Sequence, residues 1–177
     1  MAEDRAFLPV RIAILTVSDT RGPADDRSGD LLVERLTAAG HVLADRAIVR
    51  DEQPAIEDRL RVWIADPSVD VVISTGGTGL TGRDVTVEAH AAVYEKAAPA
   101  FGVLFTMLSF SKIGTAAVQS RACAGVAGGT YLFALPGSPG ACRDAWDGIL
   151  AAQLDSRHRP CNFVEIMPRL EEHLQRK

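Results

Sequence analysis

The sequence is poor in cysteine, and its cysteines are far apart. Among 177 residues there are three, Cys123, Cys142 and Cys161, and no two of them form a Cys-x-x-Cys pair. An odd number of widely spaced cysteines argues against a disulfide framework and offers no zinc-ligand spacing. We therefore expect reduced thiols, which are typical of cytoplasmic proteins.

The residues at the start show no apolar signal core, so no secretory leader is expected, and no long apolar run is seen. The first ten residues, MAEDRAFLPV, mix acids with Arg5 and contain no apolar signal core. No run approaches the roughly 18–20 apolar residues that are needed to cross a bilayer. We therefore expect a cytoplasmic protein without membrane contacts, in which residues 1–10 form a flexible N-terminal extension.

Neither sign of charge is in large excess. The chain has 19 basic and 23 acidic residues, which gives a formal net charge of −4 at pH 7. A mildly acidic chain is a poor candidate for coating nucleic acid, so no nucleic-acid partner is expected. The composition, with 47% hydrophobic and 24% charged residues, is typical of a globular protein of this length. We predict one domain over residues 1–177.

The sequence does contain an alternation of strand-like and helix-like segments. Strand-like apolar runs cover residues 11–17, 42–49, 69–75 and 131–135. Helical spacing is seen in the sets Leu32, Leu36 and Ala39; Ile56, Leu60 and Ile64; residues 88–96; Phe101, Leu104, Phe105 and Leu108; and Cys142, Trp146, Ile149 and Gln153. Residues 113–127 fit neither pattern clearly. The alternation predicts an α/β domain with a mostly parallel central sheet.

A parallel sheet also predicts where a ligand binds. In such sheets the site lies beyond the carboxyl ends of the strands, in the loops that lead into helices. This rule selects the segments 18–29, 50–53, 75–86 and 136–140, all of which are rich in Gly, Ser, Thr or Asp.

The segment from Thr75 to Thr86, TGGTGLTGRDVT, carries the clearest chemical signal. Its spelling contains Gly-x-Gly-x-x-Gly, but the residues after it do not fit a dinucleotide fold, and no Gly-Lys-Ser/Thr ends it as in a Walker A loop. Glycine-loop amides and threonine hydroxyls still suit phosphate, and Arg83 can neutralise its charge. Asp84 beside them indicates Mg²⁺. The simpler alternative is a tight turn with an Arg83–Asp84 surface pair.

The other loops give weaker signals. Asp51 and Glu52 follow the second strand, where acids are most often solvent-exposed, but Asp51 falls on the same sheet edge as Asp84 and could share a cation with it. In the segment 136–140, Ser138 is expected to cap a helix that begins at Pro139, and the same helix end can bind an anion. Asp26 or Ser28 could cap the helix after the first strand.

Taken together, the motifs resemble a known family. The chain resembles the molybdenum cofactor biosynthesis proteins of the MoaB/MogA type from about residue 11 to residue 165, and its tail resembles the MoaB branch. The motifs that carry the resemblance are TVSDTR (16–21), Ser28-Gly29, Asp51-Glu52, TGGTG (75–79), RDVT (83–86), IGTA (113–116), QSRA (119–122), FALPGS (133–138) and QLDSRHRPCNF (153–163).

The resemblance implies a three-layer α/β sandwich that forms a homotrimer or hexamer and binds molybdopterin. It also implies Mg²⁺-dependent adenylylation of molybdopterin by ATP before molybdate insertion. Asp51 and Asp84 match the family's catalytic aspartates and are the expected Mg²⁺ ligands. The expected nucleotide- and pterin-binding residues are Ser18, Asp19, Ser28, Gly29, Thr75, Gly76, Gly77, Thr78, Gly79, Arg83, Thr86, Pro136, Gly137 and Ser138.

The chain departs from the family pattern at three positions. Val87 stands where the family usually has proline, Val103 where it has an acid, and Thr106 where it has an arginine. If Val103 and Thr106 line the substrate pocket, pterin binding is weakened; if that helix face packs on another subunit, it is not. The alternative function is therefore a pterin- or nucleotide-binding oligomer that has lost adenylyltransferase activity.

Overall fold

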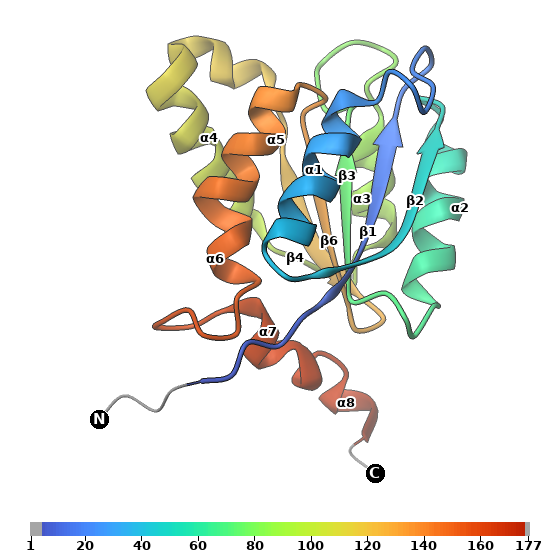
Figure 1. Cartoon of the computed structure of the whole chain (residues 1–177). Coiled ribbons are helices and arrows are strands. Elements are labelled where there is room, and N and C mark those ends of the chain that lie inside the picture. The colour runs from blue at the N-terminus through green and yellow to red at the C-terminus, as the bar shows by residue number, and fades with distance from the viewer. Residues whose placement is uncertain (1–4, 176–177) are drawn as a thin grey trace.

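The computed structural model describes residues 5–175 and contains a six-stranded sheet between two layers of helices (Figure 1). The strand order is β2-β1-β3-β6-β5-β4. The first four strands in this order are parallel, whereas β5 is antiparallel to both β6 and β4. The strands are β1 (Arg11–Val17), β2 (Val42–Val49), β3 (Val71–Thr75), β4 (Lys96–Ala97), β5 (Cys123–Ala127) and β6 (Thr130–Leu135).

Helices cover both faces of the sheet. One face packs against α1 (Arg27–Ala38), α4 (Pro99–Ile113) and α5 (Pro139–Ala145), and the other against α2 (Gln53–Ile64) and α3 (Thr86–Val93). The remaining elements are the 3₁₀ segments Gly114–Gln119 and Met167–Arg169, the π-helical turn Trp146–Leu150, α6 (Ala151–Gln153), α7 (Phe163–Ile166) and α8 (Glu172–Gln175). The predicted three-layer α/β fold is confirmed.

The central strands are apolar because both of their faces are covered. All five residues of β3 are buried, and β1 is buried from Ile12 to Val17. Strands covered on both sides read as continuous apolar runs rather than as alternating ones. In the register, Thr75 lies beside Thr16 and Leu135, so β1, β3 and β6 end at the same level. Their following loops therefore meet at one edge of the sheet.

The sequence was least informative for β4 and β5, the strands at one side of the sheet. The predicted helix over residues 88–96 ends at Val93, because Glu95 donates a backbone hydrogen bond to Val126 and the chain joins the sheet as β4. The ambiguous segment 113–127 forms the end of α4, the 3₁₀ segment and β5. β4 is short and β5 is built from small residues, so neither segment shows the alternation of apolar and polar residues that indicates a strand.

The expectation that no segment is long and apolar enough to cross a membrane was wrong. The helical stretch Pro99–Gln119 has 21 residues and meets this criterion by length and composition alone. Within the fold, Phe101 and Phe105 of this stretch are buried in the core, and the Phe101 ring lies 5.1 Å from that of Phe133. One side of the stretch therefore packs on the core, whereas only 22% of its most apolar part is buried in the structure.

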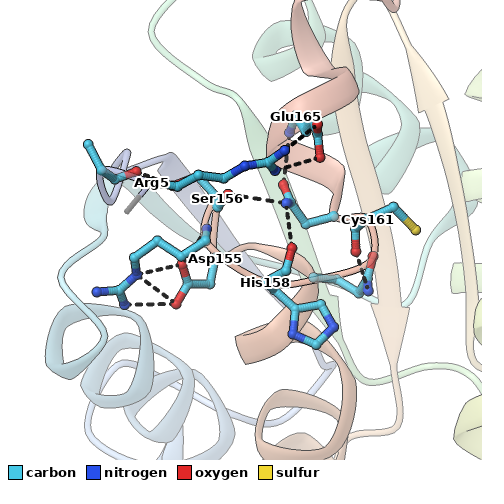
Figure 2. A network of polar contacts seen from close by, with 10 residues as sticks. Arg5, Asp155, Ser156, His158, Cys161 and Glu165 are labelled. Atoms are coloured by element: carbon cyan, nitrogen blue, oxygen red, sulfur yellow. Dashed lines mark hydrogen bonds and ion pairs between the residues drawn. The ribbon is translucent and has the colours of Figure 1, made fainter. Parts of the chain in front are cut away.

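The N-terminal segment lies against the C-terminal part of the chain. Arg5 forms an ion pair with Glu165 at 3.0 Å (Figure 2). The Ser156 hydroxyl accepts from the backbone N–H of Leu8 and donates to the carbonyl of Ala6. These contacts anchor residues 5–10 of the predicted extension; residues 1–4 lie outside the described residues.

Candidate functional site

The loops after β1, β2, β3 and β6 surround a cavity of about 380 Å³ at the edge of the sheet that is uppermost in Figure 1. All four segments selected from the sequence contribute to it, as the strand-end rule predicts. The predicted site residues that line it are Ser18, Asp51, Gly76, Gly77, Thr78, Gly79, Asp84, Pro136 and Gly137.

The glycines after β3 are required by close backbone packing. Gly76 and Gly77 have φ angles of +103° and +63°, a region that favours glycine. A Cβ at Gly76 would collide with the carbonyl of Val17, and one at Gly77 would come within 2.9 Å of Asp51 Oδ1. The helix α3 begins only at Thr86, so these glycines form a loop beside β1 rather than the first turn of a helix.

Asp51 lies in this cluster of loops, and the pKa of its carboxyl is raised. Burial raises the pKa of the Asp51 carboxyl, and the negative charges of Asp19 and Asp84 raise it further. Its backbone N–H donates to Asp19 Oδ1 at 3.2 Å, which ties the loop after β2 to the loop after β1. A carboxylate held near two others is stabilised by a bound cation.

Asp84 also lines the cavity and is held in place by Thr81. Its Oδ2 accepts hydrogen bonds from the hydroxyl of Thr81 at 2.6 Å and from the N–H of Thr81 at 2.9 Å. The Thr81 hydroxyl bond lowers the pKa of Asp84 and outweighs the opposing effect of burial. Asp84 is therefore an ionised, oriented carboxylate.

The simpler interpretation of this segment required an ion pair between Arg83 and Asp84, but Arg83 pairs with Asp19 instead. Its guanidinium donates to both carboxylate oxygens of Asp19, each at 2.9 Å, from the rim of the cavity. The Arg83 side chain is 60% exposed. Arg83 and Asp19 thus join two of the loops that surround the cavity without lining it themselves.

Several predicted binding residues support the walls instead of lining them. The Thr86 hydroxyl donates to the carbonyl of Gly76 at 2.7 Å, and the Thr75 hydroxyl donates to that of Pro136 at 3.0 Å. Gly29 donates its N–H to Asp26, which caps α1. Because these hydroxyl and amide protons are used by the protein, they shape the cavity without being free to bind a ligand.

The loop after β6 packs against the loops after β1 and β3. The Ser28 hydroxyl and Arg21 Nη1 both donate to the carbonyl of Gly137, at 2.7 and 3.0 Å. Ser138 caps α5 and Pro139 is its first residue, as predicted. Ser28 also lines an adjoining hollow of about 450 Å³, which shares Thr20 and Arg21 with the first.

The carboxylates of the site fit Mg²⁺ only if the ligand supplies further oxygens. Within residues 5–175, no three His, Cys, Asp or Glu side chains gather into a metal-binding group. Mg²⁺ commonly binds one or two carboxylates together with substrate phosphates and water. Asp51 and Asp84, which line one cavity and interact through their charges, match this pattern.

The structure adds residues that the sequence reasoning did not select. Thr20, Arg21, Gln119 and Ser120 also line the cavity. Arg21 could have been selected, since it is the last residue of the TVSDTR motif (16–21) that begins at the end of β1. Gln119 and Ser120 belong to the segment whose structure was ambiguous.

The departures from the family pattern lie away from this cavity. Val103 and Thr106 are exposed on α4, and neither lines the cavity within the chain. Val87 is in the first turn of α3, where replacing proline removes no hydrogen bond. Two hollows of about 840 and 760 Å³, one among Asp66, Asp70 and Glu171 and one apolar, between α4 and Phe163, do not contain the glycine loop.

Comparison with known proteins places this geometry in a family. The family described as "Probable molybdopterin binding domain" matches residues 13–156. Molybdenum cofactor biosynthesis protein B of Escherichia coli K12 is 52% identical over 157 residues, covering 89% of this chain and 92% of that protein. The Bacillus subtilis protein of the same name is 42% identical over 146 residues, covering 82% and 86%.

A solved structure agrees with these sequence matches. A crystal structure of a molybdenum cofactor biosynthesis protein B has 38% sequence identity and a TM-score of 0.86, covering 95% of this chain and 99% of that one. Fold, motifs and loop cluster therefore lead to one assignment. The chain belongs to the MoaB/MogA family of molybdenum cofactor biosynthesis proteins.

Proposed function

We propose that the protein is a molybdopterin adenylyltransferase, which uses ATP and Mg²⁺ to activate molybdopterin before molybdate insertion. The observation that carries the proposal is the convergence of Asp51 and Asp84 on one cavity beside the glycine loop. Family membership and the molybdopterin-binding description of the matching domain support molybdopterin as the partner.

The nucleotide phosphates are assigned to the glycine loop. Gly76, Gly77, Thr78 and Gly79 line the cavity, and side chains at Gly76 and Gly77 would collide with Val17 and Thr86, so the loop backbone itself forms the wall. Backbone amides in such loops donate hydrogen bonds to phosphate oxygens, so no charged side chain has to be buried opposite the phosphate. Arg21, which also lines the cavity, supplies positive charge.

The reaction is a phosphoryl-type substitution at the α-phosphorus of ATP. A terminal phosphate oxygen of the pterin forms a bond to that phosphorus, the bond to the β-phosphate oxygen breaks, and pyrophosphate leaves. Mg²⁺ held by Asp51 and Asp84 would neutralise the charge on the phosphates. The protein residues hold the two anionic substrates together and in line, which is the main source of acceleration in this type of chemistry.

The departures in α4 do not argue against catalysis in this chain. The reason for considering an inactive binding protein was the replacement of two polar side chains by Val103 and Thr106. Since neither residue lines the cavity, the proposed nucleotide and metal residues are intact. The adenylyltransferase is therefore the function that the geometry favours.

The variant Asp84→Asn tests the proposal. We expect it to lower pyrophosphate release in the presence of molybdopterin far more than it weakens ATP binding at saturating Mg²⁺, because the carboxylate acts through the metal on developing charge. Pyrophosphate release and the dissociation constant of Mg-ATP should be measured on the same samples. Normal turnover by the variant would remove Asp84 from the proposed mechanism.

A further inference from the structure

Arg121 lies behind the glycine loop and makes an unusual set of contacts with it. It precedes β5, and its Nε donates to the carbonyl of Gly79 at 2.9 Å. Its Nη2 donates to the carbonyl of Asp84 at 3.1 Å, and its backbone N–H donates to the carbonyl of Thr78 at 3.2 Å. One residue thus binds three carbonyls of the segment that carries Asp84.

These contacts fix the direction of the peptide groups. In a trans peptide the C=O and the following N–H point in opposite directions. When Arg121 holds the carbonyl of Thr78, the N–H of Gly79 is turned away from Arg121, and this N–H lies on the side of the Asp84 carboxylate. A Cβ at Gly79 would be 2.7 Å from Asp84 Oδ2, which shows how closely the loop backbone wraps this carboxylate.

A second charged residue holds Arg121 itself. Its Nη1 forms an ion pair with Glu88 in the first turn of α3, and its Nη2 lies 3.3 Å from Glu88 Oε2. The planar guanidinium can satisfy two carbonyls and a carboxylate at once, which a lysine ammonium on a flexible stem cannot do in the same geometry. Arg121 therefore joins β5, the glycine loop and α3 at one point.

We propose that Arg121 is a positioning residue that holds the Thr78–Asp84 segment so that the Asp84 carboxylate faces the cavity. Arg121 itself does not line the cavity, so it acts through the loop and not on the ligand. That Arg121 holds the loop follows from the contacts above. The expected effect of Arg121 on the binding of Mg²⁺ and nucleotide rests on the function proposed for Asp84.

The test compares Arg121→Gln and Arg121→Lys with the wild-type protein. The matched control is Arg169→Gln, which removes an arginine–glutamate pair with Glu172 that is remote from the glycine loop. Two quantities are measured on each protein. The first is amide hydrogen exchange in residues 77–85 without ligand, and the second is the Mg²⁺ concentration that gives half-maximal ATP binding.

We expect exchange in residues 77–85 to be faster in Arg121→Gln while the rest of the chain exchanges as before. The half-maximal Mg²⁺ concentration should rise about 10-fold or more, as is usual when a residue that orients a metal ligand is lost. Arg121→Lys should keep an ion pair with Glu88 and therefore be more stable to heat than Arg121→Gln. It should still show the fast exchange and the high Mg²⁺ requirement. Arg169→Gln should change neither quantity.

Two results overturn the proposal. One is unchanged loop exchange in Arg121→Gln, and the other is full recovery of both quantities in Arg121→Lys, which would reduce Arg121 to a positive charge. If Arg121→Gln fails to fold, Arg121→Lys decides by the same two quantities. If the wild-type protein does not bind ATP, the function proposed for Asp84 fails, while hydrogen exchange still decides whether Arg121 holds the loop.

Discussion

Arg83 and Asp19 form an ion pair of 2.8 Å across the rim of the cavity, joining the loop after β3 to the loop after β1. Both side chains are accessible to water, so a phosphate can replace the carboxylate of Asp19 as the partner of Arg83. In the nucleotide complex proposed above, Asp19 would therefore compete with the phosphates for Arg83.

The first prediction follows from this competition. Arg83→Gln should weaken ATP binding about tenfold, which is typical for the loss of one charged hydrogen bond. Asp19→Asn should strengthen it, because Arg83 is released for the phosphates. Isothermal titration at two salt concentrations checks both signs, and the idea fails if the two substitutions change the affinity in the same direction.

The second prediction concerns the acidity of Asp51. Its pKa lies above the ordinary aspartate value through burial and through the charges of Asp19 and Asp84. Metal-dependent binding should therefore be lost as the pH falls through this raised pKa, where Asp51 takes up a proton. In Asp19→Asn the pKa of Asp51 should move down. Carboxyl NMR titration of the metal-free protein measures it; an unchanged Asp51 titration would contradict the assigned cause.

The third prediction concerns assembly. Val103, Met107 and Phe110 of α4 are 60%, 63% and 60% exposed, which gives the helix an apolar outer surface. Since such a surface on a small protein is normally covered by another chain, we expect a homotrimer or hexamer. Sedimentation at micromolar concentration should give a multiple of the subunit mass, and Phe110→Glu should reduce it. A monomeric wild-type protein would refute this expectation.

The same surface decides the effect of restoring the family residues in α4. Because Val103 and Thr106 lie away from the cavity, Val103→Glu combined with Thr106→Arg should leave pterin affinity unchanged and weaken the oligomer. The two quantities are measured on the same double variant. A tenfold gain in pterin affinity would instead place this helix face in a substrate pocket.

The sequence was sufficient for the central sheet because burial on both faces leaves a direct signal. The runs over β1 and β6 correspond closely to the strands, and the loops after them meet where a parallel sheet requires. Thus Asp51 and Asp84, which are 33 residues apart in the chain by their numbering, could be assigned to one site.

The part of the site that the sequence missed has a topological explanation. β5 runs antiparallel to β6, so its beginning, and not its end, lies at the edge of the sheet where the cavity is. Gln119 and Ser120 precede this strand and therefore reach the cavity wall from a direction that the strand-end rule does not consider. Arg121, which follows them, contacts the glycine loop without lining the cavity. The small residues of β5 gave no periodic pattern from which its direction could be inferred.

The most direct test of the proposed reaction is to follow the α-phosphate of ATP. The protein is incubated with ATP labelled at the α-phosphate, molybdopterin and Mg²⁺, and the label and pyrophosphate are quantified. We predict that the label moves to the pterin with one pyrophosphate released for each pterin modified, and that removing Mg²⁺ abolishes the transfer. Binding of both ATP and molybdopterin without any transfer of label would contradict the proposed reaction and identify a binding protein instead.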